Sequence, residues 1–261
     1  MHLIYASRRA SLWRMAEPSS SQVALVTGGS RGIGRACAVR LAADGFALVI
    51  VYSSNAEAAE EALAEIRGTG ADGFAQRADV ADETAMGEVF DRVEAEFGGV
   101  DAVVHAAGRM PLSPLVDLDL EELDGVHRTN IRGTFVVDQL AAQRLRDGGS
   151  IVNFSTSVVG KYFPSYGAYV ASKGAVEGLT RVLANEMRGR DINVNAVSPG
   201  PTATELFLDG KSDEQVDELA HAVPLERLGQ PGDIARVVAF LVSEDGHWIN
   251  GQVVRANGGL V

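Results

Sequence analysis

From Gln22 onward, short apolar runs alternate with longer stretches in which apolar residues recur at the helical period. The apolar runs predict strands at residues 23–26, 48–51, 73–75, 102–104, 151–154, 192–197 and 252–255. The periodic stretches predict helices at residues 35–44, 56–67, 83–97, 123–146 and 167–187. This alternation predicts an α/β fold with a doubly wound parallel sheet of about seven strands and helices on both faces.

No linker or internal repeat interrupts residues 22–261, so we expect them to form a single domain. Residues 1–21 differ from the rest because they carry Arg8, Arg9 and Arg14 and show no sustained periodicity. We expect this segment to be a disordered leader outside the domain. A transit peptide is an alternative, whereas a secretory signal would need a longer apolar core.

Composition narrows the class of protein. Hydrophobic residues make up 46% of the 261 residues and charged residues 22%, which is typical of a soluble globular protein. No apolar run approaches the ~20 residues of a membrane span. A formal net charge of −12, without a basic tail, argues against nucleic acid or an anionic membrane as partner. The single cysteine, Cys37, excludes an intrachain disulfide and leaves the redox compartment open, with a reducing cytoplasm as the default expectation. The five histidines predict no metal site.

Tyr169 and Lys173 stand four residues apart in a predicted helix, so their side chains lie on one face. Free phenol titrates near pH ~10. Bringing the tyrosine pKa to about 7 requires about 4 kcal/mol of stabilisation of the phenolate, which a nearby cation can supply. The same spacing also fits a surface helix with an incidental pair.

A glycine-rich turn follows the first predicted strand, with Gly28, Gly32 and Gly34 inside the segment 27–34. Backbone N–H groups and the dipole of the following helix can bind a pyrophosphate there, and the absence of side chains allows close approach. A tight turn without a ligand is the alternative reading.

The Gly-x-x-x-Gly-x-Gly turn, the Tyr-x-x-x-Lys pair and their order resemble the classical short-chain dehydrogenase/reductase family, over residues 22–261. Within that family the chain is closest in character to 3-oxoacyl-[acyl-carrier-protein] reductases. The resemblance implies a Rossmann-type fold and hydride transfer between a nicotinamide and a carbonyl or carbinol carbon. It implies that Tyr169 exchanges the proton, that Lys173 lowers its pKa and binds the ribose, and that Asn130 supports a water.

The family serine is ambiguous in this chain. Ser157 fits the usual Ser-x-x-Gly pattern and is our choice for holding the substrate oxygen, whereas counting thirteen residues back from Tyr169 reaches Thr156. Ser155 is a third hydroxyl in the same run. A second departure is His105-Ala106, where the family usually has two asparagines.

The resemblance also implies a set of cofactor-binding residues. These are Gly28, Ser30, Arg31, Gly32, Ile33, Gly34, Tyr52, Ser53, Ser54, Asp79, Val80, Ala106, Ala107, Gly108, Tyr169, Lys173, Pro199, Gly200, Thr202 and Thr204. An NAD-preferring site carries a carboxylate at the end of the second strand, but that position is Tyr52. Because Arg31 and Arg35 lie in and just after the glycine turn, we expect NADP(H).

Substrate and partners are less sharply defined. The segment 203–225 interrupts the strand and helix alternation and is predicted to be a substrate lid, whose apolar members suit an acyl or other nonpolar chain. A 3-oxoacyl thioester is one candidate, and Arg144, Arg146 and Arg190 could receive an acidic acyl carrier protein. Polyols, sugars and small ketones remain open. The family predicts a homotetramer, and the Tyr-Lys pair argues against a non-catalytic nucleotide-binding regulator.

Overall fold

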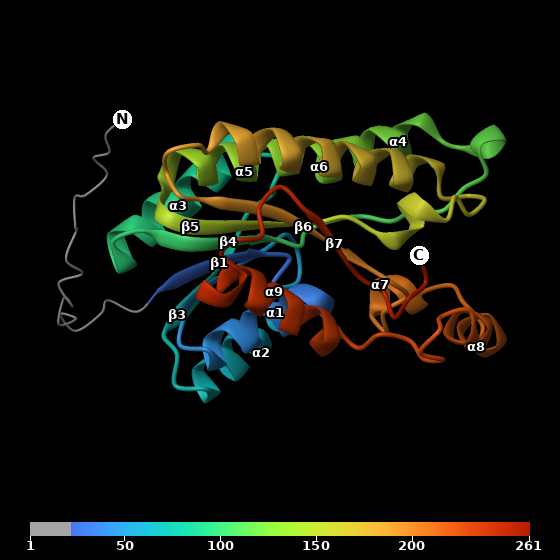
Figure 1. The fold of residues 1–261 in the computed structure, drawn as a ribbon, viewed down its shortest axis with the longest axis horizontal. Coiled ribbons are helices and arrows are strands. Elements are labelled where there is room, and N and C mark those ends of the chain that lie inside the picture. The colour runs from blue at the N-terminus through green and yellow to red at the C-terminus, as the bar shows by residue number, and fades with distance from the viewer. Residues whose placement is uncertain (1–21) are drawn as a thin grey trace, which may run out of the picture.

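A computed structural model describes residues 22–261, so the predicted leader lies outside the described residues. At its centre is a seven-stranded sheet in the order β3-β2-β1-β4-β5-β6-β7, and all paired strands are parallel (Figure 1). The strands are β1 Val23–Thr27, β2 Ala47–Tyr52, β3 Gly73–Arg77, β4 Val100–His105, β5 Leu145–Phe154, β6 Asn193–Pro199 and β7 Val253–Ala256. The predicted single-domain α/β fold is therefore confirmed.

Helices cover both faces of the sheet. They are α1 Gly32–Ala43, α2 Ala56–Gly68, α3 Glu83–Phe97, α4 Leu120–Val126, α5 Gly133–Arg144, α6 Gly167–Glu186, α7 Glu205–Leu208, α8 Asp213–His221 and α9 Pro231–Val242. In Figure 1, α1, α2 and α9 lie below the sheet, and α3, α5 and α6 lie above it. Within residues 22–261 no helix is both long and apolar enough to cross a membrane.

Alternating strand residues fill two separate cores. Val26 and Ile50 belong to the core beneath α1, α2 and α9, whereas Leu25 and Val49 belong to the core beneath α3, α5 and α6. Successive side chains of a strand point to opposite faces, so most positions of a doubly covered strand are apolar. Burying each such side chain contributes about 1.5–3 kcal/mol, which explains the continuous apolar runs.

Two local predictions differ from the structure. The predicted helix 123–146 is divided, because a π-helical turn, η2 His127–Arg132, separates α4 from α5. The chain then enters β5 directly at Leu145. Helix α9 was not predicted, although Pro231 at its start, the capping pair of Gln230 and Asp233, and a buried apolar stripe all favour a helix there.

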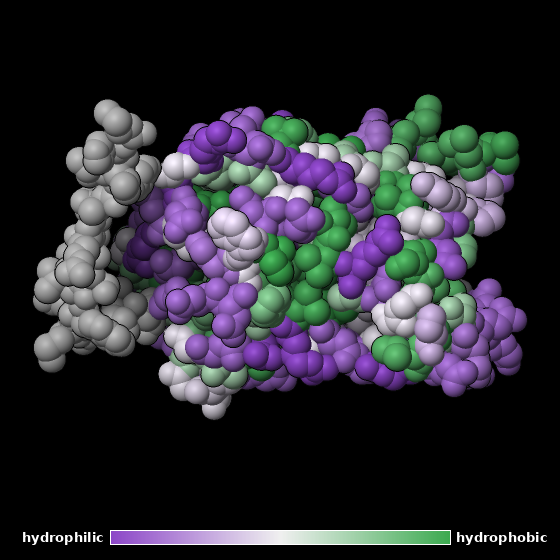
Figure 2. Space-filling view, viewed as in Figure 1, coloured by the Kyte–Doolittle hydropathy of each residue, from purple (hydrophilic) through white to green (hydrophobic). Residues whose placement is uncertain are grey.

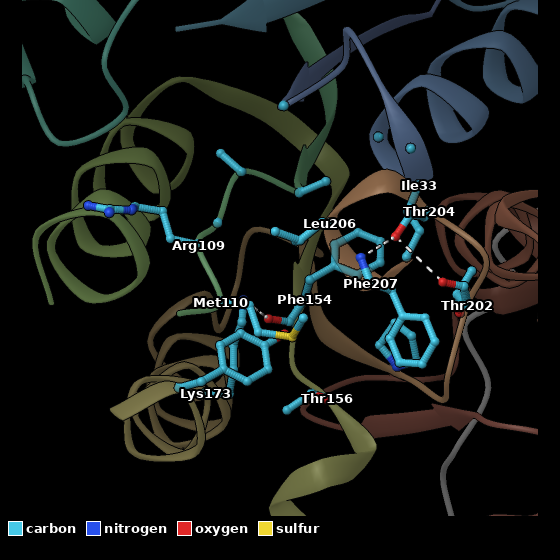
Figure 3. A pocket seen from close by; sticks show the side chains of 18 of the residues that line it. Ile33, Arg109, Met110, Phe154, Thr156, Lys173, Thr202, Thr204, Leu206 and Phe207 are labelled. Atoms are coloured by element: carbon cyan, nitrogen blue, oxygen red, sulfur yellow. Dashed lines mark hydrogen bonds between the residues drawn. The ribbon is translucent and has the colours of Figure 1, made fainter. Parts of the chain in front are cut away.

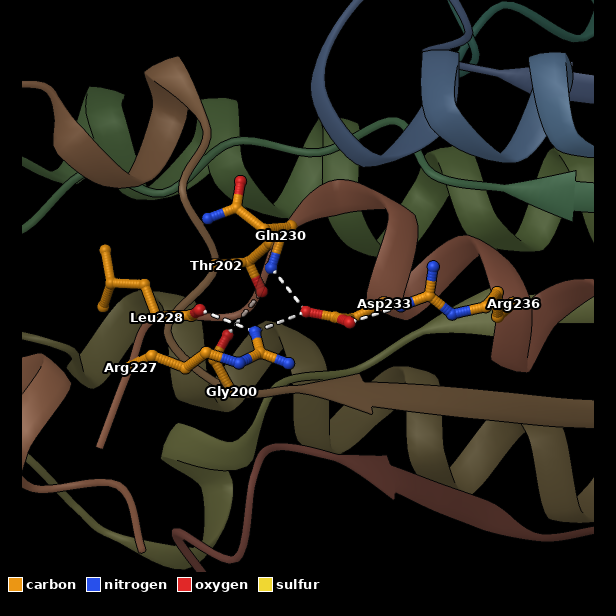
Figure 4. A network of polar contacts seen from close by, with 7 residues as sticks. All are labelled: Gly200, Thr202, Arg227, Leu228, Gln230, Asp233 and Arg236. Carbon is orange, nitrogen blue, oxygen red and sulfur yellow. Dashed lines mark hydrogen bonds and ion pairs between the residues drawn. The ribbon is translucent and has the colours of Figure 1, made fainter. Parts of the chain in front are cut away.

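The predicted lid is a long excursion between β6 and α9 that contains the short helices α7 and α8. Its two ends are held together, because Gly229 N donates to Pro201 O at 2.8 Å and Ala203 N donates to Gly229 O at 2.8 Å. Asp233 accepts hydrogen bonds from Arg227 and from Gln230 N, at 2.7 and 2.8 Å (Figure 4). The base of the excursion is thus fixed to the start of α9.

Candidate active site

A cavity of about 460 Å³ lies at the carboxyl ends of the strands, where the strand order reverses between β1 and β4 (Figure 3). Ligands of open α/β sheets bind at such a reversal. The predicted residues that line it are Gly28, Ser30, Arg31, Gly32, Ile33, Gly34, Tyr52, Ser53, Asp79, Val80, Ala106, Ala107, Gly108, Ser157, Tyr169, Lys173, Pro199, Gly200, Thr202 and Thr204. Ser54 and Asn130 are not among the lining residues.

The glycine turn forms one wall of the cavity with bare backbone. Gly28 has φ of +65°, and a Cβ there would lie 3.0 Å from Ala107 N. A Cβ on Gly34 would lie 2.2 Å from Gly28 O, so this position admits no side chain. Helix α1 begins at Gly32, which places its free N–H groups at the cavity. These features fit a dinucleotide pyrophosphate.

The end of β2 carries no carboxylate, because Tyr52 and Ser53 line the cavity there. Arg31 is exposed, and its Nη1 lies 3.8 Å from Glu205 Oε2 at the start of α7. We expected Arg35 to supply free positive charge to this region, but it does not. Its guanidinium is paired with Glu65 at 3.0 Å and with Glu61 at 3.3 Å on α2.

Lys173 is buried and Tyr169 is partly buried, and both lie on the face of α6 that lines the cavity. Lys173 Nζ lies 5.8 Å from the centre of the Tyr169 ring and donates to Phe154 O at 2.8 Å. Burial lowers the pKa of Lys173 to about 8 and raises the pKa of Tyr169 to about 12. The expected lowering of the tyrosine pKa is therefore not observed, because desolvation of the phenolate outweighs other influences. Tyr169 keeps its proton at neutral pH.

The three candidate hydroxyls have different surroundings. Ser157 Oγ donates to Ser198 O at 3.2 Å and accepts from Asn257 Nδ2 at 3.0 Å. Ser155 Oγ donates to Glu177 Oε1 at 2.7 Å. Hydrogen bonding with the Thr156 side chain acts to lower the pKa of Tyr169, which places the Thr156 hydroxyl beside the phenol.

Asn130 is buried in the π-helical turn, and its side chain amide is fully engaged. Its Oδ1 accepts from Arg109 N at 2.8 Å, and its Nδ2 donates to Arg109 O at 2.9 Å and to Ser172 Oγ at 3.0 Å. The side chain joins the segment after β4 to α6. It positions the walls of the cavity and has no donor left for a water.

His105 stands where the family usually has asparagine. Its Nδ1 lies 2.7 Å from Thr27 Oγ1, and Ala107 N donates to this oxygen at 3.3 Å. Burial, reinforced by the charge of Lys173, lowers the pKa of His105 to about 3. The imidazole is therefore neutral and links the ends of β1 and β4.

The far end of the cavity was not predicted in detail. Its walls are mainly large apolar and aromatic side chains, namely Met110, Phe163, Tyr166, Leu206, Phe207, Leu219 and Leu260. Figure 3 shows Met110, Leu206 and Phe207 at the cavity, whereas the side chain of Arg109 points away from it. Phe163 and Tyr166 could have been predicted as cavity-lining residues because they lie close to Tyr169 along the chain. No local pattern marks Leu260, which comes from the C-terminal segment.

The three arginines proposed to dock an acyl carrier protein are paired within the domain. Arg144 contacts Asp91 at 2.6 Å, Arg146 contacts Asp101 at 2.8 Å, and Arg190 contacts Asp147 at 2.8 Å. They surround the start of β5, at the amino edge of the sheet, whereas the cavity lies at the carboxyl edge. They are therefore unsuited to deliver a tethered substrate.

Comparison with known proteins identifies the family. The family model described as Enoyl-(Acyl carrier protein) reductase matches residues 28–261. A short-chain type dehydrogenase/reductase of Picea abies is 44% identical, over 92% of this chain and 92% of its own length. An NADPH-dependent aldehyde reductase-like protein, chloroplastic, of Arabidopsis thaliana is 38% identical, over 98% of this chain and 100% of its own length.

Among solved structures, a short chain dehydrogenase from Burkholderia cenocepacia in complex with NADP has a TM-score of 0.86 and 38% identity. The match covers 92% of this chain and 97% of that chain. The chain belongs to the short-chain dehydrogenase/reductase family. It is accordingly an oxidoreductase, and the predicted family membership is confirmed.

Proposed function

We propose that the protein reduces an aldehyde or ketone with an apolar, partly aromatic skeleton, using NADPH. The observation that carries this proposal is that Tyr169 lies in the wall of one cavity, between the glycine turn and an apolar end. NADP(H) is the cofactor, since a relative is an NADPH-dependent reductase and a similar structure binds NADP. The residues fit it, because the end of β2 carries no acid and Arg31 stands beside the glycine turn.

In the proposed mechanism, bound NADPH supplies the hydride, and residues of this chain hold and protonate the substrate oxygen. Tyr169 donates its proton to that oxygen as negative charge develops. Lys173, held by Phe154 O, stabilises the tyrosinate that results. The glycine turn and the start of α1 bind the pyrophosphate, and Asn130 acts as a positioning residue through Arg109 and Ser172.

The hydroxyl that holds the substrate oxygen is a choice between neighbours. Ser157 is the sequence-based choice, and its oxygen is engaged with Ser198 and Asn257. Thr156 interacts with Tyr169 instead, so its hydroxyl can reach an oxygen that Tyr169 protonates. These contacts support Thr156 as the substrate-binding hydroxyl, with Ser157 shaping the loop around it.

The substrate class follows from the lining of the far end of the cavity. Phe163 and Tyr166 pack with ring centroids 6.0 Å apart, and Phe207 approaches from α7. Aromatic and aliphatic walls favour a flat or branched apolar body over a polyol or a sugar, which would need several polar partners. A 3-oxoacyl thioester remains the second candidate because the family model matched is that of an acyl carrier protein reductase.

We also propose a homotetramer in the cytoplasm. Large apolar side chains are exposed on helices, including Phe135 on α5, Val182 on α6 and Phe240 on α9. Figure 2 shows apolar surface also near the end of the molecule that carries α4, where Leu115 and Val116 are exposed. Light scattering on the purified protein measures the mass, and a monomer would refute the assembly.

The function is tested by NADPH oxidation against a panel of aromatic ketones and aldehydes, acetoacetyl thioesters, small ketones and sugars. We expect turnover of the aromatic carbonyl compounds. Tyr169→Phe should lower kcat by at least about 10²-fold while leaving the Kd for NADPH nearly unchanged. A Tyr169→Phe variant with near wild-type kcat would refute the catalytic assignment. Turnover confined to sugars would refute the substrate class.

A further inference from the structure

Strand β3 ends beside the part of β2 that lines the cavity. Arg77 is the register partner of Tyr52, and Ala78 N donates to Tyr52 O at 3.0 Å. Paired residues of neighbouring parallel strands direct their side chains to the same face of the sheet. Arg77 therefore projects on the Tyr52 side, at the carboxyl end of β2.

The base of the Arg77 guanidinium is fixed to the backbone that follows β2. Arg77 Nε donates to Ser53 O at 2.9 Å. This bond leaves the four N–H groups of Nη1 and Nη2 for other partners. Within residues 22–261 no carboxylate forms an ion pair with Arg77, and the bond to Ser53 is its one hydrogen bond. Its side chain is exposed, so an incoming anion can reach it.

Other cations near this region are less available. Arg35 is paired with two glutamates, and Arg128 is paired with Asp79 at 2.7 Å. The formal net charge of −12 means that an anionic ligand must find local positive charge. Arg31 on the glycine turn is exposed, and its acidic neighbour, Glu205, lies at 3.8 Å. Arg77 stands beyond β2 with its terminal nitrogens unpaired.

We propose that Arg77 binds the 2′-phosphate of NADP(H), together with Arg31. The proposal rests on the cofactor assigned above and adds a residue that sequence reasoning did not select. A 2′-phosphate is a compact anion with three oxygens, and the two terminal nitrogens of an arginine can bind two of them at once. Tyr52 and Ser53 line the cavity at the end of β2. Arg77 does not line the cavity itself, but its bond to Ser53 O and its pairing with Tyr52 place it on the β3 side of this point.

The alternative is that Arg77 only braces the Ser53 carbonyl. Arg77→Gln separates the two roles, because the glutamine Nε2 stands at the same place along the side chain as the arginine Nε. The variant keeps a donor for Ser53 O and loses the charged end. Arg67→Gln is the matched control, since Arg67 donates to Gly73 O at 3.4 Å near the opposite end of β3 and the charge change is the same.

The test measures Kd by calorimetry for NADP⁺, NAD⁺, 2′,5′-ADP and 5′-AMP, without turnover. We expect Arg77→Gln to weaken NADP⁺ and 2′,5′-ADP at least about tenfold and to leave NAD⁺ and 5′-AMP unchanged. Arg77→Lys should recover part of the loss, and Arg67→Gln should bind all four as the wild type does. Salt should weaken NADP⁺ less in Arg77→Gln than in the wild type.

Equal weakening of NADP⁺ and NAD⁺ by Arg77→Gln would overturn the proposal in favour of bracing alone. An unchanged Kd for NADP⁺ would overturn it as well. If the wild type itself binds NAD⁺ as tightly as NADP⁺, the cofactor assignment fails, and this outcome is visible without any variant. The two failures are therefore distinguishable.

Discussion

Replacing Lys173 with methionine measures how strongly burial destabilises the ammonium group beside Tyr169, the proposed proton donor. Lys173 has an ordinary pKa of 10.5 that burial lowers to about 8. The folded protein therefore binds this proton less tightly than the unfolded chain does. Its stability rises with pH where the unfolded state holds more protons, which for this group lies between about pH 8 and 10.5.

The size of the effect follows from the pKa difference. Each pKa unit corresponds to about 1.4 kcal/mol, so the full shift is worth about 3 kcal/mol. Between pH 7 and pH 10 the free energy of unfolding gains about 2.5 kcal/mol rather than the full amount, because pH 10 lies below the ordinary pKa of 10.5 and most unfolded chains still hold the proton. Lys173→Met has no titrating group at this position and should lack this contribution.

The assay is urea unfolding followed by circular dichroism at pH 7 and pH 10, for the wild type and Lys173→Met without added cofactor. Other titrating groups, including Tyr169, affect both proteins and cancel in the difference. We expect the change in unfolding free energy from pH 7 to pH 10 to be more positive in the wild type by about 2.5 kcal/mol. An equal change in both proteins would refute the reasoning, because Lys173 would then titrate normally in the folded state.

Three further predictions concern other parts of the molecule. Thr156→Ala should lower kcat about 10²-fold and Ser157→Ala less than tenfold in steady-state assays, and the reverse order would restore Ser157 as the substrate-binding hydroxyl. Gly34→Ala should abolish NADPH binding in calorimetry, because the new Cβ would meet Gly28 O at 2.2 Å, and an unchanged Kd would contradict the description of the turn. Burial raises the pKa of Asp138 to about 7, so the folded protein holds a proton that the unfolded chain loses, and the stability contributed by this proton declines as pH rises from 3.8 to about 7. From pH 5 to pH 8, the free energy of unfolding measured in urea should therefore fall by about 2–3 kcal/mol more in the wild type than in Asp138→Asn. An equal fall in both proteins would contradict the raised pKa of Asp138.

The architecture and the main candidate residues of the site could be predicted from the amino-acid sequence. A parallel sheet covered on both faces requires continuous apolar strands, so the runs around Leu25, Ile50 and Val103 were readable without any knowledge of contacts. Tyr169 and Lys173 share one helix, so their spacing alone placed them together. The glycine turn could also be recognised from the sequence, because its strand, turn and helix are consecutive in the chain.

The electrostatics and the outer walls of the site depend on contacts between distant parts of the chain. The sequence suggested a cation that lowers the pKa of Tyr169, but burial of the phenol is a property of the folded environment and raises that pKa to about 12. The arginines at 35 and 144 look free in the sequence and are neutralised by carboxylates from other helices.

Sheet register also remained beyond the reach of local patterns. Arg77 meets the end of β2 only because β3 pairs with β2 in the observed register. Leu260 reaches the cavity from the C-terminal segment in the same long-range manner. Local periodicity reports which face a residue occupies within its own element, whereas pairing partners, burial and charge neutralisation depend on residues distant in the chain.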